Sequence, residues 1–286
     1  MRIMKKYELT SEMKNHIGHK LYRIKALKDF GSVKAGQLGG WVESEENLSQ
    51  DGTAWIFDNA KVYENAVVYG HAEVHNNALV YGNSRVFGKA NVSDNVRMYN
   101  NAAVYGNADV SNDAEIYGNA VVCDTAIVSD YTEVYGRAAV FGKAKVYGYA
   151  TIHGEARIHG SAEVYANAEI YGEANICGCI NVNGNTIVHG NAKICGRVNI
   201  YGDADICGGA KVCSEADYIV FKNFWSSGRY FTWTRSNNMW RVGCFYGTGE
   251  ELIKKAYADS EKSGKEYKRV VRYVESILAD EKKENE

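Results

Sequence analysis

A small residue recurs every six positions through more than half of this chain. The series begins at Ala54 and Ala60 and runs to Ala216, and a branched aliphatic residue such as Val62 or Val68 stands two positions after nearly every member. A period of six matches neither the 3.6-residue period of a helix nor a simple array of hairpins. A short period kept in phase over such a length predicts a solenoid.

Each six-residue unit contains a short strand and a corner. The small and the branched residue face one way, and the residue between them faces the other. The next positions hold residues such as Gly70, Asn76 and Asp94, which tolerate a positive φ. Three units close a triangular coil of about 18 residues, and about nine coils stack as parallel sheets at about 4.8 Å per coil. The absence of proline suits such ladders.

The repeat resembles that of the hexapeptide-repeat superfamily, in which an aliphatic residue is followed four positions later by a small one. Residues 62–67 (VYENAV) and 104–109 (VYGNAD) fit this pattern. The resemblance implies an all-β solenoid, a left-handed parallel β-helix, which we place at residues 48–216. The left-handed winding is an implication of the resemblance and departs from the usual right-handed crossover.

A narrower similarity lies in the segment that leads into the repeat. Asp29 to Gly36, Gly39-Gly40-Trp41-Val42 and Trp55-Ile56 are similar to the corresponding part of the bacterial YdcK-like proteins. Those proteins are β-helical and are labelled transferases. The resemblance carries no catalytic motif that can be transferred to residues of this chain.

The two ends of the stack require caps, because a stacked sheet otherwise exposes open edges. We expect an N-terminal β cap over residues 1–47. Residues 217–286 are expected to form a small α+β domain, with a three-stranded meander over 218–224, 229–235 and 239–245. Two helices should follow, with capping boxes at Thr248/Glu251 and Ser263/Glu266.

Charge and cysteine content limit the partners that we expect. The net charge of −2 argues against a nucleic-acid binder, and no apolar stretch is long enough to span a bilayer. Seven cysteines and a start without a signal-peptide pattern predict reduced thiols in the cytoplasm. No cofactor is expected.

Histidines are the main candidates for chemistry in the repeat. The superfamily resemblance implies active sites built from loops that interrupt the coils and from a histidine near a subunit interface, yet this repeat has no interruption. His153 and His189 share one corner column and His159 lies on another. Two coils separate the first two by about 9.6 Å, too far to share one metal ion. We therefore predict no catalytic residue and no metal site.

Cysteines and tyrosines also form columns. Cys177, Cys195 and Cys213 recur on one corner at disulfide-compatible spacing, and structural thiols are favoured there over a redox or metal role. Cys179 and Cys207 lie off that column and complete no ligand set. The tyrosine column either stabilises the strands as a ladder of stacked rings or serves as a binding strip. It comprises Tyr63, Tyr81, Tyr99, Tyr117, Tyr135 and Tyr171, and His153 and His189 continue it.

Aromatic residues concentrate after the repeat. They suit the core of a small domain, but together with arginines they could also bind a small planar or anionic ligand. The candidate ligand-binding residues are Trp225, Arg229, Tyr230, Trp233, Arg235, Trp240 and Arg241.

One face of the prism has small apolar outward residues at its centre, which favours self-association, with a trimer preferred because of the superfamily resemblance. The alternative is that these residues only favour strand formation. The candidate interface comprises Val67, Tyr69, Phe87, Ala103, Tyr105, Val121, Ala139 and Phe141.

These observations favour a non-enzymatic, homo-oligomeric β-helical scaffold or binding protein with an aromatic C-terminal domain for recognition or capping. One alternative is an acyl- or nucleotidyl-transferase acting at a subunit interface. Another is a phage or mobile-element protein that sequesters a small, nucleotide-like ligand.

Overall fold

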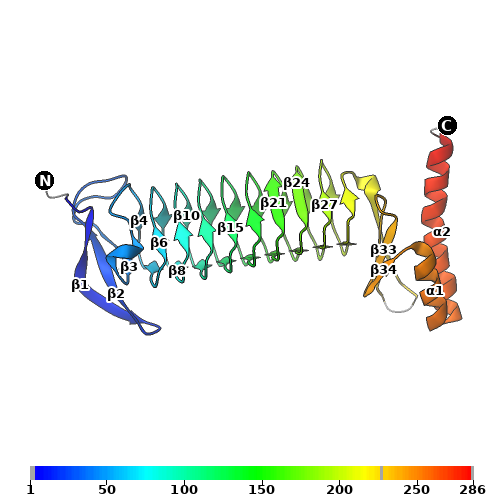
Figure 1. Cartoon of the computed structure of the whole chain (residues 1–286), viewed down its shortest axis with the longest axis horizontal. Helices are drawn as coiled ribbons and strands as arrows, with labels where there is room; N and C mark the ends of the chain where they lie inside the picture. Colours follow the sequence, from blue (N-terminus) through cyan, green and yellow to red (C-terminus); the bar gives the residue numbers. More distant parts are fainter. Residues whose placement is uncertain (1–3, 226–227, 285–286) are drawn as a thin grey trace.

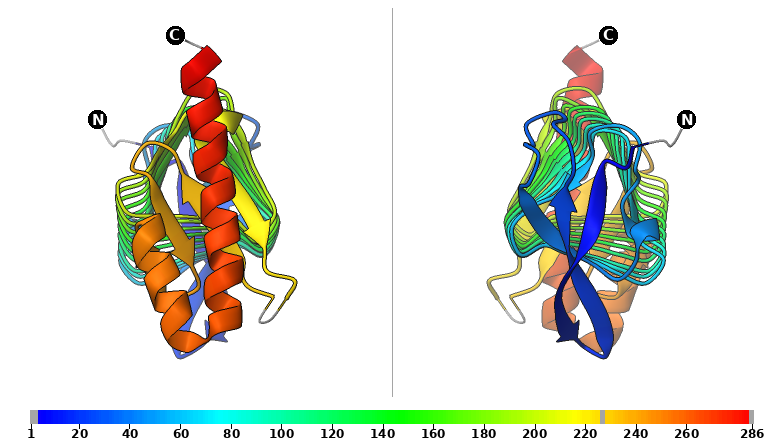
Figure 2. Two further views of the ribbon diagram at one scale, coloured as in Figure 1. Left: turned by 90° about the vertical axis from the view of Figure 1, so that its right-hand side faces the viewer. Right: turned by 90° about the vertical axis from the view of Figure 1, so that its left-hand side faces the viewer.

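The computed structural model describes residues 4–225 and 228–284 and has the shape of a long triangular prism with a different cap at each end (Figures 1 and 2). The predicted parallel β-helix is confirmed. Three parallel sheets form its sides, which we call the first, second and third faces.

The strands repeat in the same order along the prism. The first face contains β3 (Leu38–Val42), β5 (Lys61–Val62), β8 (Leu79–Val80), β11 (Arg97–Met98), β14 (Glu115–Ile116), β17 (Glu133–Val134), β20 (Thr151–Ile152), β23 (Glu169–Ile170), β26 (Ile187–Val188) and β29 (Asp205–Ile206). The second face contains β4 (Trp55–Ile56), β7 (Glu73–Val74), β10 (Asn91–Val92), β13 (Asp109–Val110), β16 (Ile127–Val128), β19 (Lys145–Val146), β22 (Glu163–Val164), β25 (Asn181–Val182) and β28 (Asn199–Ile200). The third face contains β6 (Val67–Val68), β9 (Arg85–Val86), β12 (Ala103–Val104), β15 (Val121–Val122), β18 (Ala139–Val140), β21 (Arg157–Gly160), β24 (Asn175–Gly178), β27 (Lys193–Ile194) and β30 (Lys211–Val212).

Backbone hydrogen bonds join each coil to the next. The N–H of Tyr81 donates to the carbonyl of Met98 at 2.9 Å, and equivalent bonds recur along the faces. Corners are closed by residues with positive φ, for example Asn76 at 57° and Gly82 at 71°. A Cβ added at Gly82 would lie 2.7 Å from the backbone nitrogen of Asn100, so the close stacking of corners also favours glycine at this position.

Ladders of aliphatic side chains fill the prism. Residues such as Val122 and Ile152 are fully buried, as the alternation predicts. A few polar residues replace alanine in the interior, and each satisfies its hydroxyl locally. Thr132 donates to the carbonyl of Ser129 at 2.7 Å, and Ser84 donates to that of Tyr81 at 2.8 Å. These substitutions therefore bury no unpaired hydroxyl.

The stack begins one turn earlier than the repeat indicates. β3 pairs in parallel with β5, and Leu48 bridges to Val68, which adds a turn to the expected nine or so. The short helix η1 (Glu45–Asn47) replaces a corner in this turn. The residues that pair between this first turn and the next coil are two positions further apart in the sequence than those of the later coils. The six-residue period therefore does not reveal this first turn. Antiparallel strands β1 (Tyr7–His16) and β2 (His19–Ala26) continue the first-face sheet beyond β3.

The C-terminal domain follows the short helix η2 (Glu215–Asp217) and has four antiparallel strands rather than the three that we expected. They are β31 (Tyr218–Lys222), β32 (Tyr230–Thr234), β33 (Met239–Val242) and β34 (Phe245–Gly247). The predicted strand over 239–245 is broken at Gly243, whose φ of 55° reverses the chain and allows β34 to pair with β33.

Two helices cover this sheet on the side away from the prism (Figures 1 and 2). α1 (Gly249–Asp259) has the predicted Thr248/Glu251 capping box. α2 (Glu261–Glu284) begins before the expected Ser263/Glu266 box, because the hydroxyl of Ser260 accepts the backbone N–H of Ser263. In the described part of the chain, no helix is long and apolar enough to cross a membrane.

Candidate functional site

A cavity of about 220 Å³ lies in the C-terminal domain, between α1 and the sheet. Its lining combines mostly apolar surface with two cationic side chains and one carboxylate. The lining residues are Arg229, Val242, Cys244, Phe245, Leu252, Lys255, Ala256, Asp259 and Tyr267. The Nζ atom of Lys255 lies 5.6 Å from the centre of the Phe245 ring. Burial raises the pKa of the Tyr267 hydroxyl.

The aromatic residues predicted to bind a ligand lie mainly in the domain core. Trp233 and Trp240 are fully buried and pack with Phe231 and Val242 under α2. Trp225 packs at the edge of this cluster, and Tyr230 is half-buried on β32. None of these four predicted residues lines the cavity. Their main contribution is apolar area, which a domain of this size needs for stability.

The three predicted arginines lie in three different places. Arg229 lines the cavity. Arg235 forms a two-pronged ion pair with Glu281 of α2, at 2.7 and 3.0 Å. Arg241 points toward the prism, and its Nε donates to an oxygen of Asp205 on β29 at 2.8 Å. The structure therefore does not bring the seven predicted residues together into one site.

The tyrosine column is a continuous stack of rings. Neighbouring rings from Tyr63 to His189 are nearly parallel, and the Tyr117 and Tyr135 centroids lie 4.7 Å apart. Because each ring covers its neighbour, the ring faces are occupied within the ladder. Burial, together with the nearby Glu115 carboxylate, raises the pKa of the Tyr99 hydroxyl to about 12.

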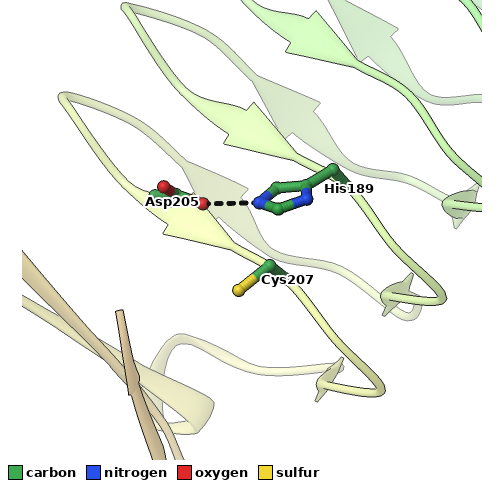
Figure 3. Close-up of side chains that lie close together, drawn as sticks. All are labelled: His189, Asp205 and Cys207. Carbon is green, nitrogen blue, oxygen red and sulfur yellow. Dashed lines mark hydrogen bonds and ion pairs between the residues drawn. The ribbon is translucent and has the colours of Figure 1, made fainter. Parts of the chain in front are cut away.

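At its C-terminal end this column meets a cluster of three chemically different side chains (Figure 3). His189 ends the ring stack, Cys207 takes the next position of the column, and Asp205 lies on β29 beside them. The Nε2 atom of His189 is 3.0 Å from an oxygen of Asp205. The ligating nitrogen, oxygen and sulfur of the three residues all lie within 4.8 Å of one another. We call this group the junction cluster.

Arg241 of the C-terminal domain compensates the negative charge of Asp205 in the junction cluster. Burial by itself would raise the pKa of the Asp205 carboxyl, but hydrogen bonds from His189 and Arg241 outweigh it and lower that pKa. Burial and the Asp205 charge raise the pKa of the Cys207 thiol to about 11. The hydroxyl of Thr232 on β32 also accepts the backbone N–H of Asp205 at 2.9 Å. The cluster therefore lies where the domain contacts the last coils.

The junction cluster was missed from the sequence. Cys207 stands 18 residues after His189, on the column that the tyrosines and histidines form. A histidine followed by a carboxylate 16 positions later and by a cysteine 18 positions later is the sequence signal of such a cluster. The sequence predicts that Cys207 completes no ligand set, and the structure places this residue next to a histidine and a carboxylate.

The cysteine column differs from the expected row of reduced thiols. Cys195 and Cys213 are joined by a disulfide, with their Cα atoms 4.6 Å apart. Cys177 remains a free thiol one coil away. The bond links the last two strands of the third face, β27 and β30, close to the C-terminal domain.

The predicted interface residues lie along the third face and its neighbouring corner. Val121 and Ala139 are adjacent in register on β15 and β18. The rings of Phe87 and Tyr105 stack at 4.6 Å along the corner. The histidine of that corner, His159, stacks on the Phe141 ring and lies next to this face.

Comparison with known proteins gives a partial similarity. No protein-family model matches the chain. A stretch of 80 residues is 38% identical to a protein of Escherichia coli K12 named "Uncharacterized acetyltransferase YdcK", and it covers 25% of this chain and 24% of that protein. The match thus spans about a quarter of the relative's length. The β-helix and this match agree with the resemblance found in the sequence, and the chain is similar to the YdcK-like proteins.

Proposed function

We propose that this chain is a β-helical scaffold whose C-terminal domain binds a small anionic ligand. The observation that carries the proposal is the cavity between α1 and the sheet, whose lining combines the cations of Arg229 and Lys255 with apolar side chains. An apolar pocket with a few convergent polar groups is typical of small-molecule sites. A volume of about 220 Å³ suits a ligand of nucleobase or monosaccharide size.

The charges around the cavity favour an anion. Two cations and one carboxylate, Asp259, line the cavity, so the formal charge of its lining is positive. A guanidinium can bind a carboxylate or phosphate through two hydrogen bonds, and Arg229 forms no ion pair among the described residues that would compete. The prism then serves to hold this domain at a fixed distance from the N-terminal cap.

Native mass spectrometry of protein purified from its host tests this proposal, because a retained ligand adds a defined mass. Adenosine monophosphate serves as a probe in a thermal-shift titration. We expect binding to weaken at least tenfold in Arg229→Ala and Lys255→Ala. Lys254→Ala is the matched control, since Lys254 precedes Lys255 on α1, is exposed, and does not line the cavity. If no ligand is retained and the probe causes no shift, the proposal is wrong.

We also propose that the third face associates three copies of the chain. Small apolar side chains such as Val121 and Ala139 form the centre of this face, and closed symmetry places the same patch on every subunit. Light scattering should show a trimer that dissociates in a Val121→Lys, Phe141→Glu double variant with unchanged circular dichroism. A monomeric parent protein would contradict this arrangement.

A second candidate function is acyl transfer at such an interface. Two observations favour it: the relative's name includes acetyltransferase, and His159 lies at the corner beside the proposed contact face. Its Nε2 atom is 2.9 Å from the side-chain oxygen of Asn175, which orients the ring. Replacing His159 by glutamine separates the two functions, and His153→Gln, which removes a histidine from another corner column, is the matched control. A cellular phenotype lost while fold and assembly persist would favour the enzyme.

A further inference from the structure

One arrangement of three side chains occurs three times along the prism. In each case a histidine at a corner contacts the outward residue 16 positions later, and a third side chain follows 18 positions later, on the next rung of the column. The three triplets are His153–Glu169–Tyr171, His159–Asn175–Cys177 and His189–Asp205–Cys207. The distances from Nε2 to the side-chain oxygen are 3.1, 2.9 and 3.0 Å. The coil geometry therefore allows the contact at these three corners, whereas His75, which has Asn91 16 positions later, contacts Glu73 instead.

The third of these triplets, the junction cluster, combines an imidazole, a carboxylate and a thiol. The first has a phenol in place of the thiol, and the second has an amide in place of the carboxylate. Imidazole nitrogen, carboxylate oxygen and thiolate sulfur are the ligands that Zn²⁺ takes in proteins. We propose that His189, Asp205 and Cys207 bind one divalent ion of the zinc type. This site is separate from the cavity of the proposed function.

The distances in the junction cluster are close to those that such an ion requires. Tetrahedral coordination at ordinary zinc–ligand lengths sets nitrogen and oxygen about 3.3 Å apart, and sulfur about 3.6 Å from each. His189 Nε2 and Asp205 Oδ1 are already 3.0 Å apart, and all three ligand atoms lie within 4.8 Å. A side-chain adjustment of about 1 Å would complete the geometry. The His189 and Asp205 side chains retain 17% and 23% exposure, so solvent reaches the edge of the cluster.

Residues of the C-terminal domain support the metal ligands. Arg241 holds the second oxygen of Asp205 at 2.8 Å, so the first oxygen is directed toward His189. Such outer contacts fix the orientation of metal ligands. When the ion binds, the Cys207 thiol loses its proton to solvent and the nitrogen of His189 that faces the ion carries none. The carboxylate and thiolate charges then balance the charge of the ion. Because Asp205 also contacts Thr232, an ion here strengthens the contact between prism and domain.

Metal titration of the full chain tests the proposal. Chelator-treated protein is titrated with Co²⁺ and then Zn²⁺ under argon without added reductant, so that the Cys195–Cys213 disulfide stays closed. We expect one ion per chain and a near-ultraviolet thiolate-to-cobalt absorption band that Zn²⁺ abolishes. Cys207→Ser and His189→Ala should weaken binding at least about 100-fold, because each removes a direct ligand.

The incomplete triplets provide matched controls. His153→Ala and Cys177→Ser remove equivalent side chains from the other two triplets and should leave affinity and absorption unchanged. Cys207→Ala replaces the serine variant if circular dichroism shows that the latter is unfolded. A chain that binds no ion at micromolar concentration, or a cobalt band that persists without Cys207, overturns the proposal. Equal losses in the control variants would overturn it as well.

Discussion

An aspartate introduced at an inward and at an outward aliphatic position tests the inward–outward alternation of the prism. Val122 is fully buried on β15, whereas Ile127 on β16 of the second face is exposed and lies outside the proposed contact face. Val122→Asp loses about 1.5–3 kcal/mol of apolar burial. It also leaves a carboxylic acid without a hydrogen-bond partner, at about 1–3 kcal/mol. Ile127→Asp avoids most of both costs.

Protonation adds a third contribution at neutral pH. A carboxyl group surrounded by aliphatic side chains folds in its neutral form, so at pH 7 its proton must be taken up from solution. With an unfolded pKa of about 3.9, this costs about 4 kcal/mol at pH 7 and about 0.5 kcal/mol at pH 4. The loss of unfolding free energy in Val122→Asp should therefore be about 7–10 kcal/mol at pH 7, and about 3–4 kcal/mol smaller at pH 4. The former is comparable to the whole stability of an ordinary domain.

Urea unfolding followed by circular dichroism at the two pH values measures this difference, with the parent protein as reference at each pH. We expect Ile127→Asp to change the unfolding free energy by less than about 1 kcal/mol at both pH values. Equal transition midpoints for the two variants would refute the assignment of Val122 to the interior. A Val122→Asp deficit that does not shrink at pH 4 would refute the protonation argument.

Three further predictions concern the tyrosine ladder and the C-terminal domain. The pKa of the Tyr99 hydroxyl is raised to about 12. The stability that the neutral Tyr99 side chain contributes is therefore fully present below pH 10 and is lost as the pH rises through 12. Melting curves recorded from pH 9 to 12 would detect this loss. Arg235→Ala removes the ion pair with Glu281 and should speed amide exchange at the C-terminal end of α2 at least severalfold, while amides of the prism stay unchanged. Thr248→Ala removes the acceptor for the backbone N–H of Glu251 and should lower the unfolding free energy of the domain by about 1 kcal/mol, as measured by urea titration.

The fold of the repeat was predictable because the period is strict. A small residue and a branched residue at fixed spacing set the strand, the corner and the number of units in a coil. The turn that contains Trp41 was not predictable in this way, because its residues pair with those 20 positions later and a helix replaces one corner. The sequence does not predict β34 as a separate strand, because the turn at Gly243 is shorter than the usual loop between two strands.

The candidate sites were less accessible to sequence reasoning. The cavity requires α1, α2 and the sheet to be packed against one another, and Lys255 and Tyr267 are brought together only by that packing. The junction cluster depends on a contact between a corner and a face of the following coil. Column arithmetic gives the positions of His189 and Cys207, but the direction in which the His189 ring points toward Asp205 comes from the corner geometry.

The uniform coil makes the prism a molecular ruler. Side chains in equivalent positions are 18 residues apart, as in the hydrogen bond between Asn76 and Asp94. Insertion or deletion of one whole coil would move the two ends by about 4.8 Å and keep every column in line. A change of six residues would instead turn the C-terminal domain by a third of a revolution about the long axis. Whole coils thus change the separation of the two caps alone, whereas single six-residue units change their relative orientation together with their separation.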